Sequence, residues 1–158
     1  STGWGHLDEY FKILKGQLNI VSGFPSSGKS EWVENIACHL ATKENWKILI
    51  YSPENHPASK HTGGLAEKIA GKQVRNLYNA ETMTDDELSK AILEISRSFT
   101  IISADEDSYS FEELLHNIEH SAEKIDMVLI DPWNELESHR PAGRTETEAS
   151  TKKQGWKL

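Results

Sequence analysis

Residues 23–30 read GFPSSGKS, and the spacing of glycine, lysine and serine in this stretch suits phosphate binding. Gly23 and Gly28 free the backbone to curl, so that successive N–H groups can point inward at phosphate oxygens. Lys29 would reach the β- and γ-phosphates of a nucleotide, and Ser30 would offer its hydroxyl to Mg²⁺. The nucleotide-binding residues expected from this loop are Gly23, Phe24, Pro25, Ser26, Ser27, Gly28, Lys29 and Ser30.

Two carboxylates follow apolar runs elsewhere in the chain. Asp131 comes after MVLI (127–130) and before Pro132, which cannot continue a strand, so it is placed to hold Mg²⁺ or its water. The alternative for Asp131 is an ordinary Asp-Pro turn. Glu54 follows the run 47–52 and could orient a water and accept its proton. On spacing alone, Glu54 is better explained as an exposed loop acid.

Short apolar runs and helical patterns alternate along the chain. The helix after the loop carries Val33, Ile36, Ala37 and Leu40 on one face. A further helix is expected over 58–71, and capping boxes at TDDE (84–87) and SFEE (110–113) begin two more. The expected strands are 18–22, 47–52, 99–103 and 127–131. This alternation predicts an α/β fold with a mainly parallel sheet flanked by helices, and a ligand site at the carboxyl ends of its strands.

Composition limits the classes of function. The 158 residues suffice for one domain with a core, and the net charge of −8 argues against broad nonspecific binding of nucleic acid, although a few local loops could still grip it. No stretch has the length and apolarity of a membrane span, and no secretory signal is recognisable. The single cysteine, Cys38, is expected in the core, which excludes an internal disulfide and fits a reducing cytosol.

The sequence changes character near its end. Residues 1–137 are expected to form the folded core, whereas 138–158 have almost no apolar periodicity and are expected to form a polar loop and tail.

Three motifs taken together resemble a known family. GFPSSGKS, YSPEN (51–55) and LIDPWNEL (129–136), with Gly16 and the lead-in WGHLDEYFKILKGQLNIVSG, are similar to the RecA-like motor domain of replicative ring helicases. These include the DnaB type, the phage primase-helicases and Twinkle-like proteins. The resemblance covers about residues 4 to 148, and its specificity comes from the combination of motifs in this order.

The resemblance implies a RecA-like P-loop NTPase core that uses ATP or another NTP with Mg²⁺. In that family pattern Lys29 and Ser30 bind the phosphates and the metal, Glu54 is the catalytic base, and Asp131 supports the metal. Family members form homo-hexamers, hydrolyse NTP at subunit interfaces and pull single-stranded DNA through the central hole. They are not membrane proteins, and the expected location is the cytoplasm of a bacterial or phage-infected cell. The candidate DNA-binding residues of this chain are His139, Arg140 and Arg144.

The chain also departs from the family pattern. Members continue beyond the metal-binding strand with another core strand, a polar phosphate sensor and an arginine that reaches the neighbouring subunit. Here the sequence stops at Leu158, so we expect a truncated motor with slow or absent hydrolysis. Two alternatives to a helicase motor follow: a nucleotide-binding or assembly module without turnover, and, ranked last, a small-molecule kinase. A kinase needs an arginine-rich lid, whereas the arginines here are scattered: Arg75, Arg97, Arg140 and Arg144.

Several other residues invite a functional interpretation. His116 and His120 have the spacing of a two-histidine metal site, but a solvated helix face is the better explanation. His56 and His61 flank the loop after Glu54 and could sense phosphate, although histidines near loops are common. Trp133 is expected to pack in the core, with stacking on a base as the alternative. Asn134 and Glu135 lie near Asp131, and Glu135 is a reserve candidate for the catalytic base.

Overall fold

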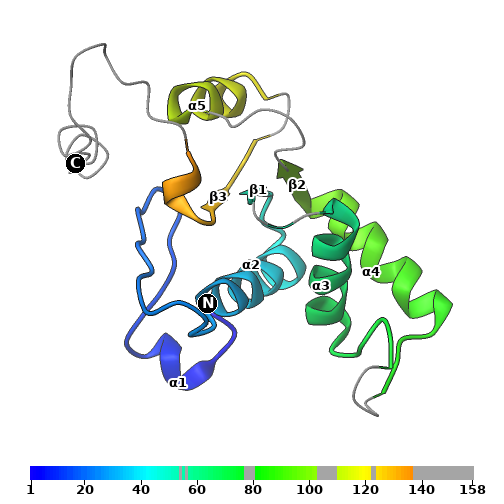
Figure 1. The fold of residues 1–158 in the computed structure, drawn as a ribbon. Helices are drawn as coiled ribbons and strands as arrows, with labels where there is room; N and C mark the ends of the chain where they lie inside the picture. The colour runs from blue at the N-terminus through cyan, green and yellow to red at the C-terminus, as the bar shows by residue number, and fades with distance from the viewer. Residues whose placement is uncertain (54, 56, 77–80, 103–109, 122–123, 137–158) are drawn as a thin grey trace.

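The computed structural model describes residues 1–53, 55, 57–76, 81–102, 110–121 and 124–136 (Figure 1). Helices and strands alternate through most of this part of the chain. They are α1 (Gly5–Asp8), α2 (Lys29–Glu44), β1 (Ile48–Tyr51), α3 (Ala58–Ala70), α4 (Asp85–Ser98), β2 (Phe99–Ile102), α5 (Phe111–Glu119), β3 (Met127–Ile130) and the 3-10 helix η1 (Trp133–Glu135).

The sheet has the order β2-β1-β3, with both pairs of strands parallel. The three strands are in step: Ile48 pairs with Phe99 and Met127 at one end, and Tyr51 pairs with Ile102 and Ile130 at the other. Parallel neighbours that end in step bring the residues after each strand to one edge. The predicted α/β class, the parallel sheet and three of the four predicted strands are therefore confirmed.

The central strand separates two apolar clusters. Ile48 and Ile50 pack into a cluster with buried residues of α2, α3 and α4, whereas Leu49 and Tyr51 pack into a second cluster with Leu114 of α5. Because side chains alternate across a strand, β1 supplies the core on both faces of the sheet. Figure 1 shows the result, with α2, α3 and α4 on one side of the strands and α5 on the other.

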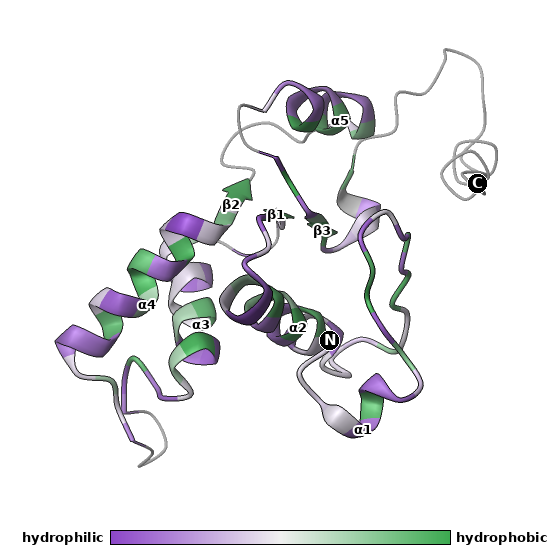
Figure 2. Ribbon diagram, turned by 180° about the vertical axis from the view of Figure 1, so that it is seen from behind, coloured by the Kyte–Doolittle hydropathy of each residue, from purple (hydrophilic) through white to green (hydrophobic). Residues whose placement is uncertain are grey.

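The helix boundaries follow from local sequence. Thr84 and Ser110 each complete the predicted capping box, with Glu87 and Glu113 respectively. The predicted stop at Gly71 is also confirmed, since this residue has φ +68° and its N–H donates to the carbonyl of Glu67. A left-handed conformation costs glycine nothing, so the chain can leave α3 there. Figure 2 shows apolar and polar stretches alternating along α4, which buries Ala91 and Ile95.

The predicted strand at 18–22 is wrong. The segment runs from the turn at Gly16 to the phosphate loop but forms no ladder with another described segment. Leu18 and Ile20 are exposed by 64% and 83%, so the apolar run does not pack into the core. The pattern indicated an extended, apolar stretch, but a strand needs a hydrogen-bonding neighbour, and β3 pairs among the described residues with β1.

The residues before this segment are attached to the core. Lys15 Nζ lies 2.7 Å from a carboxylate oxygen of Asp126, just before β3, and 5.1 Å from the ring centroid of Trp46. The ring of Trp4 stacks on that of Trp32 of α2, with centroids 6.4 Å apart. These contacts hold the lead-in against the start of β3 and one face of α2. Among the described helices, none has both the length and the apolarity needed to cross a bilayer.

Candidate nucleotide site

The phosphate loop leads directly into α2, whose first residue is Lys29. Ser26 and Gly28 have φ values of +59° and +81°, and the N–H of Ser27 donates to the carbonyl of Phe24 at 3.3 Å. The backbone therefore curls as the glycine spacing predicts. The free N–H groups at the start of a 16-residue helix make this curl a natural anion site, because their dipoles add at the helix N-terminus.

The side chain of Lys29 folds back into the curl. Its Nζ donates to the carbonyl oxygen of Phe24 at 2.8 Å. A side chain added at Gly23 would place its Cβ 3.5 Å from Cδ of Lys29 and 3.3 Å from Oγ of Ser27. The lysine stem therefore lies against Gly23, and its ammonium group is held at the carbonyl of Phe24 within the loop. The hydroxyl-bearing Ser30 follows in the first turn and is exposed.

The strand ends bring a second set of polar residues together. The N–H of Asp131 donates to the carbonyl of Tyr51 at 3.0 Å, and the N–H of Ser52 donates to the carbonyl of Ile102 at 3.3 Å. The parallel ladder therefore extends one residue past β1 and β3, and Ser52 and Asp131 lie at the same edge of the sheet. Asp131 is half-buried, as suits a ligand supported by a strand.

A turn organises the chain after β1. The N–H of Asn55 donates to the carbonyl of Ser52 at 3.3 Å, and its side-chain Nδ2 donates to Oγ of Ser52 at 2.8 Å. Ser52 is 2% exposed, so this turn is fixed to the core. Glu54, the candidate base, stands between these two residues in the sequence but lies outside the described residues, as does His56.

Two of the remaining candidate residues have a described position after β3, and three lie outside the described residues. Glu135 is in η1, directly after the strand-end edge. Trp133 is 38% exposed and meets Phe111 edge to face at 5.2 Å, so it packs on α5 with one side in solvent, short of the core position expected. The DNA-binding candidates His139, Arg140 and Arg144 lie outside the described residues, together with the whole predicted tail.

The structure gives no support to a metal site on α5. The rings of His116 and His120 are 4.1 Å apart, and Nδ1 of His120 lies 2.8 Å from the carbonyl of His116. Within the described residues, no three metal-ligating side chains gather in one place. Cys38 is buried, as predicted, and burial raises the pKa of its thiol to about 12, which removes it as a nucleophile.

A buried charge cluster, which the sequence patterns did not predict, joins α2 to α3. Glu34 of α2 accepts hydrogen bonds from Nε2 of His61 at 2.9 Å and from Nζ of Lys68 at 3.0 Å. Lys68 also meets Glu31 at 3.0 Å. A signal was present, because Glu34 lies three, four and seven residues before Ala37, Cys38 and Ala41, all on the buried face.

Burial and hydrogen bonding oppose each other in this cluster. Burial alone would raise the pKa of the Glu34 carboxyl, but the hydrogen bonds from His61 and Lys68 outweigh it and hold the pKa below its ordinary value. Burial would likewise lower the pKa of Lys68, but its bonds to Glu31 and Glu34 raise it. Both groups are therefore charged at neutral pH, and each depends on the other to remain buried.

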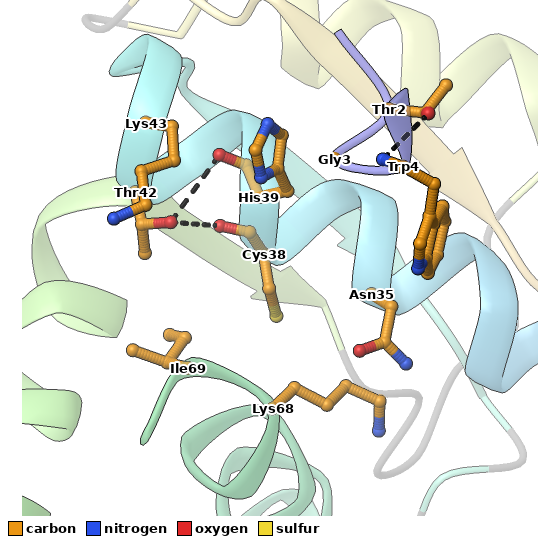
Figure 3. Close-up of a pocket in the computed structure, with 10 residues that line it drawn as sticks. All are labelled: Thr2, Gly3, Trp4, Asn35, Cys38, His39, Thr42, Lys43, Lys68 and Ile69. Carbon is orange, nitrogen blue, oxygen red and sulfur yellow. Dashed lines mark hydrogen bonds between the residues drawn. The ribbon is translucent and has the colours of Figure 1, made fainter. Parts of the chain in front are cut away.

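A cavity of about 260 Å³ lies beside this cluster, between the N-terminal segment, α2 and α3. Figure 3 shows its lining, in which Asn35 and Lys68 approach from the two helices and His39 faces Gly3. None of the ten lining residues belongs to the phosphate loop or to the strand ends. The cavity is therefore separate from the candidate nucleotide site.

Comparison with known proteins identifies the family. The chain matches the DnaB-like helicase C terminal domain over residues 1–157. It is 31% identical over 154 residues to the Twinkle homolog protein, chloroplastic/mitochondrial, of Arabidopsis thaliana, a match that covers 94% of this chain and 22% of the relative. No solved structure matches the chain significantly. The chain thus spans about a fifth of the length of this curated relative, and it belongs to the family of the DnaB-like helicase C-terminal domain.

Proposed function

We propose that this chain is the nucleotide-binding part of a replicative DNA helicase motor, which couples ATP hydrolysis to movement on single-stranded DNA. The observation that carries the proposal is the curl of residues 23–30 around the Lys29 ammonium group at the start of α2. Family membership supports it, because the family consists of helicase domains. The proposal concerns the whole protein of which these 158 residues are the sequence considered.

Each site residue has a proposed role. The backbone N–H groups of 23–30 and the Lys29 ammonium bind the phosphates of ATP or another NTP. The curled backbone at the N-terminus of α2 supports this role, because such a position favours anions. Ser30 and Asp131 are the proposed Mg²⁺ ligands, and oxygen donors of this kind suit Mg²⁺. When bound, Mg²⁺ would neutralise charge on the transferred phosphate. Glu54 would orient the attacking water and accept its proton, with the Ser52–Asn55 turn holding its neighbours in place.

The partners are proposed from family membership. The full-length protein would assemble as a homo-hexamer around single-stranded DNA, with His139, Arg140 and Arg144 contacting the strand. The Arabidopsis relative is described as chloroplastic or mitochondrial. For this chain we propose the cytoplasm of a bacterial or phage-infected cell, which suits the single buried cysteine.

One observation favours a second candidate function, nucleotide binding without turnover. The segment 18–22 does not join β3 among the described residues, so no strand links the phosphate loop to the edge that bears Asp131. A loop held in this way could bind phosphates through Lys29 while the remaining groups stay too distant for catalysis. Binding and turnover must therefore be measured separately.

The direct test of nucleotide binding is a titration with a fluorescent ATP analogue in the presence of Mg²⁺. We expect Lys29→Ala to weaken binding by at least tenfold, because it removes the one cation inside the curl. Lys12→Ala, which changes an exposed lysine outside the loop, is the matched control and should bind like the unchanged chain. Equal affinity of Lys29→Ala and Lys12→Ala would overturn the proposal.

A further inference from the structure

The cluster of Glu34, His61 and Lys68 has features that a surface ion pair lacks. The three side chains are 9%, 3% and 10% exposed, and both carboxylate oxygens of Glu34 are occupied, one by each partner. Buried charged groups are costly to desolvate, and well-packed apolar residues often stabilise a core as well or better. Stability alone therefore does not explain why these groups lie between α2 and α3.

One atom of the cluster is unsatisfied. Donation to the Glu34 carboxylate requires a hydrogen on Nε2 of His61, which leaves Nδ1 as an acceptor in the neutral ring. Nδ1 is buried and has no hydrogen-bond partner in the described part of the chain. A leucine of similar size would avoid that cost, so the histidine is better explained by the bond that it makes.

The cluster connects the two segments that carry the proposed chemistry. Glu31 and Glu34 lie in the first two turns of α2, directly after the phosphate loop. His61 lies in the first turn of α3. Its N–H and the N–H of Lys60 both donate to the carbonyl of Pro57. Asn55, two residues before Pro57 in the sequence, bonds to Ser52 at the end of β1.

We propose that Glu34 and His61 are positioning residues, which fix the start of α3, and with it the described residues Ser52, Asn55 and Pro57, relative to the helix that carries the phosphate loop. This inference rests on the proposed function for its consequence, since the candidate base Glu54 stands in the sequence between Ser52 and Asn55. The hydrogen bond from Nε2 of His61 to Glu34 is the specific link. Lys68 neutralises the second oxygen of Glu34 and extends the link to Glu31 beside the loop.

The test compares two substitutions of the same histidine. His61→Leu removes the donor and fills the space, whereas His61→Gln keeps an N–H at a similar reach. Amide hydrogen exchange is measured by NMR at Asn55, Lys60 and residue 61, whose N–H groups donate to Ser52 and Pro57. We expect His61→Leu to speed exchange at these sites by at least tenfold, and His61→Gln to stay within about threefold of the unchanged chain.

Other measurements separate positioning from general loss of structure. The amide of Leu114, bonded to Ser110 on the other face of the sheet, should exchange unchanged in both variants. The thermal midpoint of His61→Leu should fall, because Oε1 of Glu34 loses its buried donor, whereas that of His61→Gln should lie within about 3 °C of the unchanged chain. Glu44→Gln, which changes an exposed carboxylate at the far end of α2, is the control and should alter none of these quantities.

Unchanged exchange at Asn55 and Lys60 in His61→Leu would overturn the inference, and so would equal acceleration at Leu114. Failure of His61→Gln to preserve protection would do so as well, because the donor would then not be the feature that matters. These measurements need no nucleotide, so they remain decisive even if Lys29→Ala shows that the proposed function is wrong. In the assembled helicase, His61→Leu should lower kcat for ATP hydrolysis with little change in KM, since the Lys29 loop is intact.

Discussion

Glu34 is enclosed so completely that its carboxylate is stable only while both of its partners remain. Removing one member of a buried charged group leaves the others desolvated without compensation, and this loss generally exceeds the net contribution of the group. At the residue scale, therefore, the sensitive position on α2 is the one carboxylate that lies among apolar neighbours. Surface pairs such as Lys90 with Asp86, whose side chains are both more than 70% exposed, contribute far less to the free energy of unfolding.

We expect Glu34→Gln to lower the free energy of unfolding at pH 7 by about 3–5 kcal/mol, measured by urea denaturation. Because the pKa of Glu34 is below 4.5 in the folded chain, its contribution is complete above about pH 4.5 and is lost as the pH falls through the folded-state pKa. The difference between Glu34→Gln and the unchanged chain should therefore shrink in acid. A difference that stays constant from pH 7 to pH 3 would show that charge at Glu34 is not the cause.

At the scale of single elements, the capping boxes decide where two helices begin. Ser110 is fully buried; its hydroxyl accepts from the N–H of Glu113 at 3.2 Å, and its own N–H donates to the Glu113 carboxylate at 2.8 Å. α5 has nine residues, too few for a stable isolated helix, so its first turn depends on these bonds and on packing against the sheet. The packing in turn places Phe111 against Trp133, next to the strand-end edge.

Ser110→Ala should lower the free energy of unfolding by about 1–2 kcal/mol, because it removes the hydroxyl that accepts from the N–H of Glu113 in the first turn. The matched control is Ser89→Ala on α4, an exposed serine whose hydroxyl donates to the carbonyl of Asp85. That change should stay within about 0.5 kcal/mol of zero. Chemical denaturation of both variants provides the measurement, and similar losses in the two would contradict the assigned role of the cap.

At the scale of the whole molecule, the sheet is packed on both faces but one apolar segment is left outside. Ile50 is fully buried in the central strand, whereas Ile20, in a run of equal apolarity, is 83% exposed. The difference in burial between these two isoleucines therefore depends on whether each segment pairs with a neighbouring strand, which local sequence does not determine.

That difference can be measured directly. Ile50→Ala should destabilise the chain by about 2–5 kcal/mol, as expected for a large-to-small change in a core. Ile20→Ala should cost less than about 0.5 kcal/mol, because its side chain is already in water. Thermal or urea unfolding compares the two. A loss at Ile20 approaching that at Ile50 would mean that 18–22 packs as a strand, as the sequence predicted.

Local patterns predicted the parts of the fold that depend on local physics. The capping boxes at Thr84 and Ser110, the stop at Gly71, the buried face of α2 and three strands are all confirmed. The loop curl around Lys29 could be predicted because glycine spacing determines backbone freedom. Pairings between segments distant in sequence could not be predicted. Within the described part of the chain 18–22 has no strand neighbour, and Glu34 pairs with His61; both depend on how helices and strands assemble. Glu34 could have been noticed only as a charge on an apolar face.

The measurement that tests the helicase proposal most directly is steady-state NTP hydrolysis with Mg²⁺, with and without single-stranded DNA, on the assembled full-length helicase, unchanged and with Glu54→Gln or Lys29→Ala. We expect turnover that DNA stimulates, that Glu54→Gln abolishes while nucleotide still binds, and that Lys29→Ala abolishes together with binding. Nucleotide that binds through Lys29 without turnover, with or without DNA, would contradict a motor role for this chain and favour the nucleotide-binding module.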